Sequence, residues 1–217
     1  MSTQTIAQQP QHVSAKAKPP QHAVSQTYAG GANAPGGWVD YVPAAWLPYI
    51  QLSRLNPPAA GVFLIYIPHL FGLFHGAAMQ DQPPDARELA RIAAIILGHS
   101  LFWNNAGHAW NDLIDAPIDR QIERTKNRPV ARGAISPLAA AVFTATQMIG
   151  AGLFLLPLPR TTAWAVVPTV LSTGYYPFAK RHTHLAQVVL GFWLSWPSSS
   201  ARPPWCRGAV RIPRYCA

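Results

Sequence analysis

Apolar residues gather in long runs along this chain. Four runs approach the roughly 20 residues that a helix needs to cross the hydrocarbon core of a bilayer, and a fifth is shorter. They cover residues 57–77, 89–110, 137–157, 161–178 and 185–197. The first, third and fourth runs contain no Asp, Glu, Lys or Arg, and the second contains only Arg91. The pattern predicts an all-α fold, a polytopic membrane helical bundle of four to five spans.

The two ends of the chain lack this character. Residues 1–44 are rich in Gln, Ala, Pro, Ser and Gly, which predicts a disordered polar tail. This tail has neither the apolar core of a signal peptide nor the arginines of a mitochondrial presequence. Residues 41–56 mix aromatic and polar side chains, as segments at a membrane interface do. Residues 197–217 contain four Arg, no acid and no apolar run, so we expect a separate terminal segment there.

The chain is basic, with a net charge of +9, yet only 12% of its residues are charged. That share is about half the usual value for a soluble domain. The Lys and Arg residues lie mainly in loops between apolar runs, which is typical of a membrane protein rather than of a nucleic-acid-binding domain. We therefore expect a lipid membrane as a partner and no nucleic acid.

The loops also predict an orientation. The 111–136 loop is rich in Arg and Lys, and Lys180 and Arg181 follow the fourth run on the same side. The 79–88 loop, on the opposite side, is net acidic. The positive-inside rule then puts the N-terminus and the 111–136 loop in the cytosol. We expect a multi-pass protein of the endoplasmic reticulum or another endomembrane.

Half of the eight acidic residues lie in one short window, and no acid follows it. They are Asp112, Asp115, Asp119 and Glu123. Asn111, Asp115 and Asp119 are spaced four residues apart, so on a continuous helix their oxygens would share one face. Pro117 indicates a different geometry. Proline disfavours a helical residue before it, which predicts that the helix ends or kinks at Ala116 and that Asp119 lies in the loop.

Carboxylate and amide oxygens suit Mg²⁺, which protein sites commonly share with substrate phosphates. The candidate metal ligands are Asn111, Asp112, Asp115 and Asp119. Arg124, Lys126 and Arg128 follow in the same loop, and Arg and Lys are suitable partners for a diphosphate. The alternative is a solvated loop of mixed charge. A calcium loop of the EF-hand type is excluded, because the Gly and the twelfth-position Glu that it needs are absent.

Four stretches together resemble the UbiA superfamily of membrane prenyltransferases. They are R-L-N-P-P (54–58), A-G-H-A-W-N-D-L-I-D-A-P-I-D (106–119), R-T-K-N-R-P-V-A-R-G (124–133) and Y-P-F-A-K-R-H-T-H-L-A-Q-V-V-L-G (176–191). The resemblance covers roughly residues 45–196, which we interpret as a partial UbiA-type transmembrane domain. It implies a fold of about nine spans around a central cavity, of which four to five are present here.

The resemblance also implies an activity, the transfer of a prenyl group from an allylic diphosphate to an aromatic acceptor with Mg²⁺. The metal would be bound by Asn111, Asp112, Asp115 and Asp119. The catalytic residues would be Asp115, Asp119, Arg124, Lys126 and Arg128. Lys180 and Arg181 would face the diphosphate, and Arg54 would lie near the acceptor. Ionisation would leave an allylic carbocation, which a ring carbon of a phenol then attacks.

The sequence departs from this family in two places. Where the family usually reads R-L-D-K-P, Asn56 and Pro57 replace the acid and the lysine, which weakens the assignment of Arg54 to the acceptor. The resemblance also stops after Trp196, before the second Asp-rich motif of the family. From this we expect a truncated or frame-shifted product, or an inaccurate gene model, with little or no transferase activity of its own.

The main hypothesis is a fungal-type aromatic prenyltransferase of meroterpenoid or other secondary-metabolite biosynthesis. Its donor would be short, such as farnesyl diphosphate, and its acceptor a phenolic polyketide. The alternatives are a 4-hydroxybenzoate polyprenyltransferase of ubiquinone biosynthesis and an inactive truncated membrane fragment. A phosphotransferase of the CDP-alcohol type is disfavoured, because Asp112-x-x-Asp115 is followed by Ala116 and not by glycine.

Overall fold

The computed structural model describes residues 38–55, 60–80, 82, 84–158 and 160–200, and within these ranges it contains helices and no strands. This confirms the predicted all-α class. A short 3₁₀ helix, η1 (Trp38–Tyr41), precedes the α-helices. These are α2 (Leu47–Ser53), α3 (Ala60–Ala78), α4 (Ala86–Asp119), α5 (Pro137–Leu155), α6 (Arg160–His182) and α7 (Ala186–Ser200).

Local chemistry explains where the two best-packed helices begin. Asp85 is the N-cap of α4, and its side chain accepts a hydrogen bond from the Arg87 backbone N–H at 3.2 Å. Ser136 is the N-cap of α5 and accepts from the Ala139 N–H at 3.1 Å. Pro137 follows as the first helical residue, where its missing N–H costs nothing. The Asp85 cap therefore fixes the start of α4, and the Ser136 cap fixes the point where the 120–136 loop ends and α5 begins.

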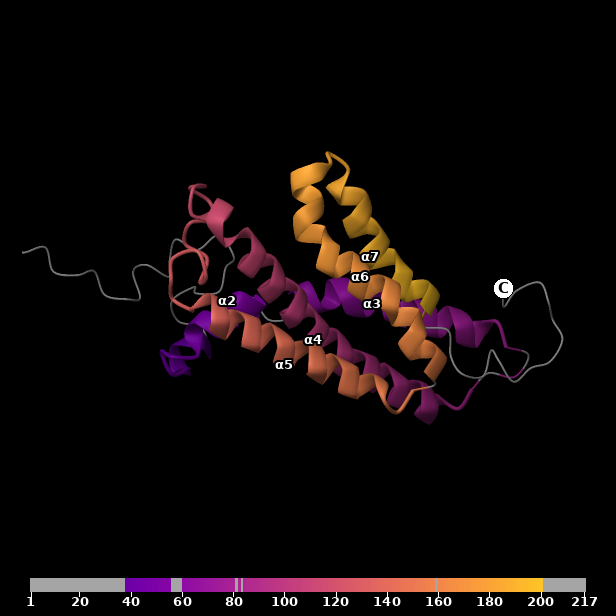
Figure 1. Cartoon of the computed structure of the whole chain (residues 1–217). Coiled ribbons are helices and arrows are strands. Elements are labelled where there is room, and N and C mark those ends of the chain that lie inside the picture. The colour runs from indigo at the N-terminus through magenta and orange to yellow at the C-terminus, as the bar shows by residue number, and fades with distance from the viewer. Residues whose placement is uncertain (1–37, 56–59, 81, 83, 159, 201–217) are drawn as a thin grey trace, which may run out of the picture.

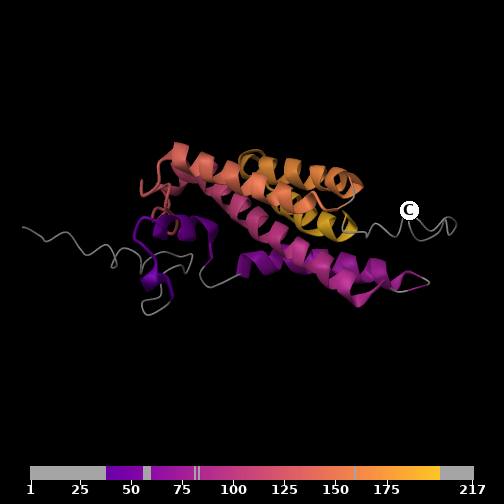
Figure 2. The ribbon, with the colours of Figure 1, turned by 90° about the horizontal axis from the view of Figure 1, so that it is seen from below.

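The long helix α4 is the centre of the bundle. It packs against α2, α3, α5 and α6, whereas α7 packs against α6 and α3. Figures 1 and 2 show α5 running antiparallel beside α4, with the α6–α7 hairpin on another side of it. Every element that carries a predicted site residue therefore reaches α4.

Glycines allow α4 and α5 to pack closely. A Cβ on Gly98 of α4 would overlap the Phe154 ring of α5, and a Cβ on Gly150 of α5 would overlap the Phe102 ring of α4. The two rings also contact each other, with centroids 5.7 Å apart. Each helix thus inserts a phenyl ring over a glycine of the other, as small-residue contacts between membrane helices allow.

Two helices among the described residues are long and apolar enough to cross a membrane, Gly61–Ala78 and Pro137–Leu155. They coincide with the predicted spans 57–77 and 137–157. The predicted spans 89–110 and 161–178 lie inside α4 and α6, which carry more polar residues. The predicted segment 185–197 lies in α7, which at 15 residues is short.

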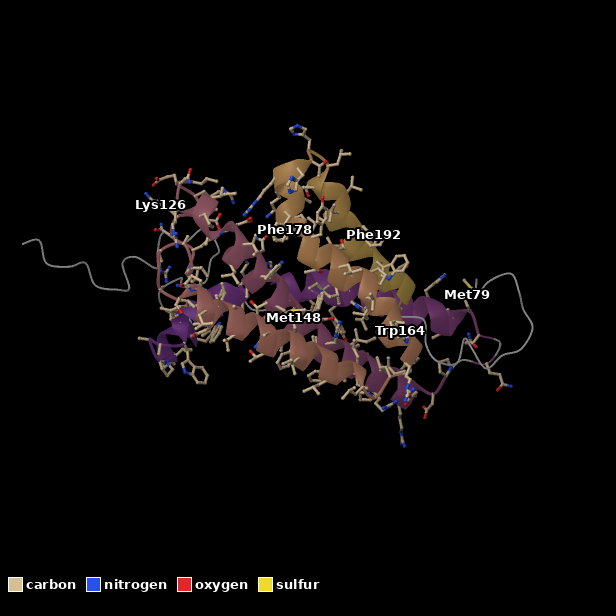
Figure 3. The ribbon with its side chains drawn as sticks, viewed as in Figure 1. Met79, Lys126, Met148, Trp164, Phe178 and Phe192 are labelled. Carbon is tan, nitrogen blue, oxygen red and sulfur yellow. The ribbon has the colours of Figure 1, made fainter. Side chains whose placement is uncertain are left out.

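Large apolar side chains face outward, and much of the interior is small or polar. Phe71 of α3, Leu153 of α5 and Leu171 of α6 are exposed, whereas Ala109, Ala140 and Ala179 are buried. This distribution is expected of helices packed in lipid. Trp164 and Met79 lie at the end of the bundle opposite Lys126 (Figure 3).

The structure corrects one prediction about the acidic window. The helix does not end at Ala116. It continues through Pro117 to Asp119, so Asp119 is the last helical residue and not part of the loop. Pro117 lies in the last turn, where the lost N–H removes a single bond, and the Arg120 N–H still donates to the Ala116 carbonyl at 3.2 Å. The prediction that the oxygens share one helical face is the one that holds.

The tails remain predictions for the most part. Residues 1–44 were predicted to be disordered. Of these, residues 1–37 lie outside the described residues, and η1 begins at Trp38. Within the predicted separate segment 197–217, residues 197–200 extend α7 and 201–217 lie outside the described residues.

Replacing Gly150 by Ala is expected to lower the stability of the bundle. The new Cβ would lie 2.7 Å from Phe102 Cε1, and overpacking of this kind costs about 1–3 kcal/mol. Gly152→Ala is the matched control, because no described atom outside its own helix surroundings lies within 4 Å of its Cβ. Thermal unfolding in detergent, followed by circular dichroism, should show a lower Tm for Gly150→Ala only. Equal Tm values would contradict the packing described here.

Candidate functional site

One face of α4 is polar along its C-terminal half. Its members recur at helical spacing and are all at least partly buried. They are Asn104, His108, Asn111, Asp112, Asp115 and Asp119. Ionisable groups at this depth in an apolar helix bundle are costly unless they are paired, and they commonly mark functional sites. The structure brings a cation from a different element to each of the three carboxylates.

Asp112 is fully buried and holds two arginines. Its Oδ1 accepts from Arg54 Nη2 at 3.2 Å, and Arg128 Nη1 lies 3.1 Å away. Asp112 Oδ2 and Arg54 Nε are both buried without a hydrogen-bond partner among the described residues. Asp112 follows the predicted membrane span 89–110 by two residues and so lies outside it. Burial raises the pKa of its carboxyl, and the charges of Arg54 and Arg128 oppose that shift.

Asp119 binds the same arginine. Arg128 Nη1 lies 2.8 Å from Asp119 Oδ2, so one guanidinium bridges two carboxylates of α4. The 120–136 loop folds back to make this possible. The Thr125 hydroxyl donates to the Asp119 carbonyl at 3.2 Å, and Arg120 Nε donates to the Ala131 carbonyl at 3.1 Å.

Asn111 and Asp115 share a lysine from α6. Lys180 Nζ lies 2.8 Å from Asn111 Oδ1 and 2.9 Å from Asp115 Oδ2. Its ammonium also lies over the Tyr176 ring, 4.6 Å from the centroid. Arg181 Nη2 donates to the Ile114 carbonyl at 2.8 Å. The C-terminal end of α6 is therefore held against the acidic face of α4.

The predicted residues separate into two groups. The structure brings together seven of them at the end of α4, and Arg181 contacts the backbone beside them. The seven are Arg54, Asn111, Asp112, Asp115, Asp119, Arg128 and Lys180. Arg124 and Lys126 are exposed, and Lys126 pairs with Glu123 at 2.7 Å instead of with the cluster. Figure 3 shows Lys126 at the tip of the loop. Roles for Arg124 and Lys126 stay a prediction.

The described residues contain no group of three His, Cys, Asp or Glu side chains placed to hold a metal ion. The acids are spread along α4 and are each paired with a cation. The donors are nevertheless of the kind that a hard divalent ion requires, carboxylate and amide oxygens. The unpartnered Oδ2 of Asp112 is a further acceptor facing no donor. These oxygen atoms are chemically suitable ligands for a divalent cation. Because each acid is already paired with a cation, an anion would have to bind those cations when the metal binds the acids.

Sequence reasoning missed four residues of this region, Asn104, Arg132, Gln51 and His108. Asn104 donates from Nδ2 to the Ser53 carbonyl at 3.2 Å, and Arg132 Nη2 donates to Gln51 Oε1 at 2.6 Å. His108 lies on the same face of α4, close to Gly61 of α3. The helical spacing from Asn104 through His108 to Asp115 was visible in the sequence, but the contacts of Gln51 depend on tertiary packing.

A model of the UbiA prenyltransferase family matches residues 88–201. Curated fungal proteins are also similar. The chain is 40% identical over 155 residues to the prenyltransferase ascA of Acremonium egyptiacum, covering 71% of this chain and 45% of that protein. It is 38% identical over 159 residues to the prenyltransferase stbC of Stachybotrys bisbyi, covering 73% and 47%.

A third relative is the DMOA farnesyltransferase nvfB of Aspergillus novofumigatus, 36% identical over 161 residues, covering 74% of this chain and 51% of that protein. The chain thus spans about half the length of the curated relatives it matches. No solved structure matches it.

Removing the bridging arginine should destabilise the fold. In Arg128→Met, Asp112 and Asp119 lose a shared cation, and breaking a buried ion pair typically costs about 3–5 kcal/mol. Lys126→Met is the control, because its pair with Glu123 is exposed and such pairs contribute about 0–1 kcal/mol. Denaturant unfolding in detergent should separate the two variants. Similar unfolding midpoints would show that Arg128 does not compensate buried charge.

Proposed function

The chain belongs to the UbiA prenyltransferase family, and we propose on that basis that it forms the donor-binding part of a membrane enzyme that prenylates an aromatic acceptor. The reaction is the transfer of a prenyl group from an allylic diphosphate to a ring carbon of a phenol. The observation that carries this proposal is the cluster at the end of α4. There, three buried Asp lie among three cations that come from α2, the 120–136 loop and α6.

The donor that we propose is farnesyl diphosphate, and the acceptor is a phenolic product of secondary metabolism. One relative is named as a farnesyltransferase, and others as polyprenyl transferases. The cluster itself recognises the diphosphate and not the prenyl chain. Chain length and acceptor identity are therefore supported by the relatives, and diphosphate binding by the arrangement of charges.

Mg²⁺ is the divalent cation that we propose for Asn111, Asp112, Asp115 and Asp119. When bound, it would supply Lewis-acid stabilisation of the diphosphate as a leaving group. Carboxylates alone repel a diphosphate, so the donor needs compensating positive charge from the protein as well. Arg128 and Lys180 supply that charge within 3 Å of the carboxylates.

The cations have different tasks because of their geometry. Lys180 carries a compact point charge on a flexible stem, suited to follow the diphosphate as negative charge develops on it. Arg128 presents a planar guanidinium, which can bind a phosphate through two N–H groups. Arg54 Nε is a buried N–H donor without a partner among the described residues, and we assign it to an oxygen of the acceptor.

Aromatic groups lie next to the cluster. Trp110 precedes Asn111 and contacts Phe178 of α6, with ring centroids 6.5 Å apart. Figure 3 labels Phe178 on α6, and Lys180 follows it by two residues in the same helix. An aromatic face stabilises a cation by roughly 0.5–2 kcal/mol, and an apolar surrounding keeps water from the allylic carbocation. These rings are suited to hold the prenyl group during ionisation.

The activity can be tested with the chain in membranes from an expression host. Labelled farnesyl, geranylgeranyl and longer polyprenyl diphosphates would be supplied with phenolic polyketides or 4-hydroxybenzoate. Because the chain spans about half the length of its relatives, we expect at most weak transfer from it. Any transfer should require Mg²⁺, use farnesyl diphosphate and a phenolic polyketide, and be abolished by EDTA. Turnover only with 4-hydroxybenzoate and long donors would instead support the ubiquinone pathway. Transfer that persists in EDTA would contradict the proposal. Absence of transfer would agree with a chain that binds the donor without turning it over, and the binding of diphosphate then decides.

Lys180 provides a second test, which needs no turnover. Lys180→Gln should weaken the binding of inorganic diphosphate in the presence of Mg²⁺ by about 10-fold or more, since a charged hydrogen bond contributes about 1.5–3 kcal/mol. Arg91→Gln, near the start of α4 where Arg91 pairs with Glu88, should bind like the unmodified chain. Isothermal titration in nanodiscs gives both affinities. Equal affinities for the two variants would remove Lys180 from the diphosphate site.

A further inference from the structure

Arg54 has an unusual backbone. Its φ of 52° and ψ of 41° place it in the left-handed region, and no other non-glycine residue among those described has a positive φ. An L-residue with a Cβ is disfavoured there, and such a conformation persists only where the surroundings enforce it. Strained residues of this kind concentrate at functional sites. The contacts that hold Arg54 in place are therefore part of the site.

The local bonds at the end of α2 explain only the turn. The Arg54 N–H donates to the Gln51 carbonyl at 3.1 Å, and the Leu55 N–H donates to the Ile50 carbonyl at 3.3 Å. This is the usual way in which a left-handed residue ends a helix, and glycine does it with less strain. The local bonds do not determine where the side chain of the capping residue points.

A long-range contact at Ser53, the residue before Arg54, helps to determine where the Arg54 side chain points. Asn104 of α4 donates from Nδ2 to the Ser53 carbonyl at 3.2 Å, and both residues are buried. A carbonyl only accepts, so this partner assigns the orientation of the amide. Asp112 lies eight residues further along α4, on the same face, and accepts from the Arg54 guanidinium. One face of α4 thus makes two contacts with this segment. Asn104 binds the backbone carbonyl just before Arg54, and Asp112 binds the Arg54 side chain.

Gly61 of α3 closes the other side of Asn104. A Cβ at Gly61 would overlap Asn104 Oδ1 and would lie 3.1 Å from His108 Nε2. Only glycine lets α3 approach this closely. The Asn104 amide is therefore held between the α3 backbone and the end of α2, with Nδ2 directed at Ser53.

We propose that Asn104, supported by Gly61, is the positioning residue for Arg54. It holds the end of α2 so that Arg54 keeps its left-handed backbone and directs its guanidinium to Asp112. The effect on substrate binding rests on the proposed function, but the effect on α2 does not. Asn105 offers a matched comparison, because it also makes an inter-helix bond, from Nδ2 to Gln147 Oε1 at 3.0 Å, and touches neither α2 nor Arg54 in doing so.

Hydrogen–deuterium exchange of the whole chain in nanodiscs tests the structural step. Asn104→Leu should speed exchange of the amides of Arg54 and Leu55 at least 10-fold, and Asn104→Ala serves as a second variant. Gly61→Ala should have the same effect by displacing Asn104. Asn105→Leu should leave these two amides unchanged. Unchanged exchange in both Asn104 variants, or an equal rise in Asn105→Leu, would overturn the proposal.

A change at Arg54 itself distinguishes positioning from general loosening. Glycine adopts the left-handed region freely, so Arg54→Gly should remove most of the effect of Asn104→Leu on the Leu55 amide. If Asn104→Leu accelerates exchange equally in both backgrounds, the bond does not act through the Arg54 backbone.

The functional step is tested by binding. A phenolic polyketide would be titrated into the unmodified chain, Asn104→Leu, Arg54→Ala and the double variant. We expect each single change to weaken binding about 10-fold and the double change to add little more. Independent, additive losses would overturn the link to Arg54. If the unmodified chain binds no acceptor, the proposed function fails, whereas the exchange result for Asn104 still stands.

Discussion

The pairing of three buried carboxylates on α4 with cations from elsewhere in the chain is the interaction on which this structure depends. A charge inside an apolar bundle is stable only with a partner, and each partner here comes from another element. Arg54 ties α2 to α4, Arg128 folds the 120–136 loop over it, and Lys180 ties α6 to it. The same contacts that compensate the acids therefore determine how the elements meet at this end of the bundle.

That arrangement has a chemical consequence. The carboxylates and cations lie within hydrogen-bonding distance of each other. In the function proposed above, a divalent metal and a diphosphate would therefore enter together without a large change in net charge. The metal would take oxygen atoms of the acids, and the diphosphate would take the cations that the acids release. A neutral ligand offers no such exchange. The cluster is thus suited to an anionic donor, in agreement with membership of a prenyltransferase family.

Much of the architecture could be predicted from the sequence because its causes are local. The apolar runs located the helices, and the four-residue spacing of Asn111, Asp115 and Asp119 placed them on one face. The prediction failed at Pro117, since a proline in the last turn removes only one bond and the helix tolerates it. Among the cations of the loop, only the fold could show that Arg128 turns inward while Lys126 pairs with Glu123. The role of Asn104 depends on the approach of α3 at Gly61, which no local pattern encodes.

The most direct test of the diphosphate site is the equilibrium binding of farnesyl thiodiphosphate, a non-reacting donor analogue, to the unmodified chain in nanodiscs. Saturable binding that requires Mg²⁺ and is displaced by inorganic diphosphate, but not by farnesol, is the predicted result. The contrary result is binding that does not depend on Mg²⁺, that inorganic diphosphate does not displace and that farnesol does displace. It would show that the chain recognises only the prenyl group. The acid and cation cluster would then be a device for holding the helices together and not a donor site.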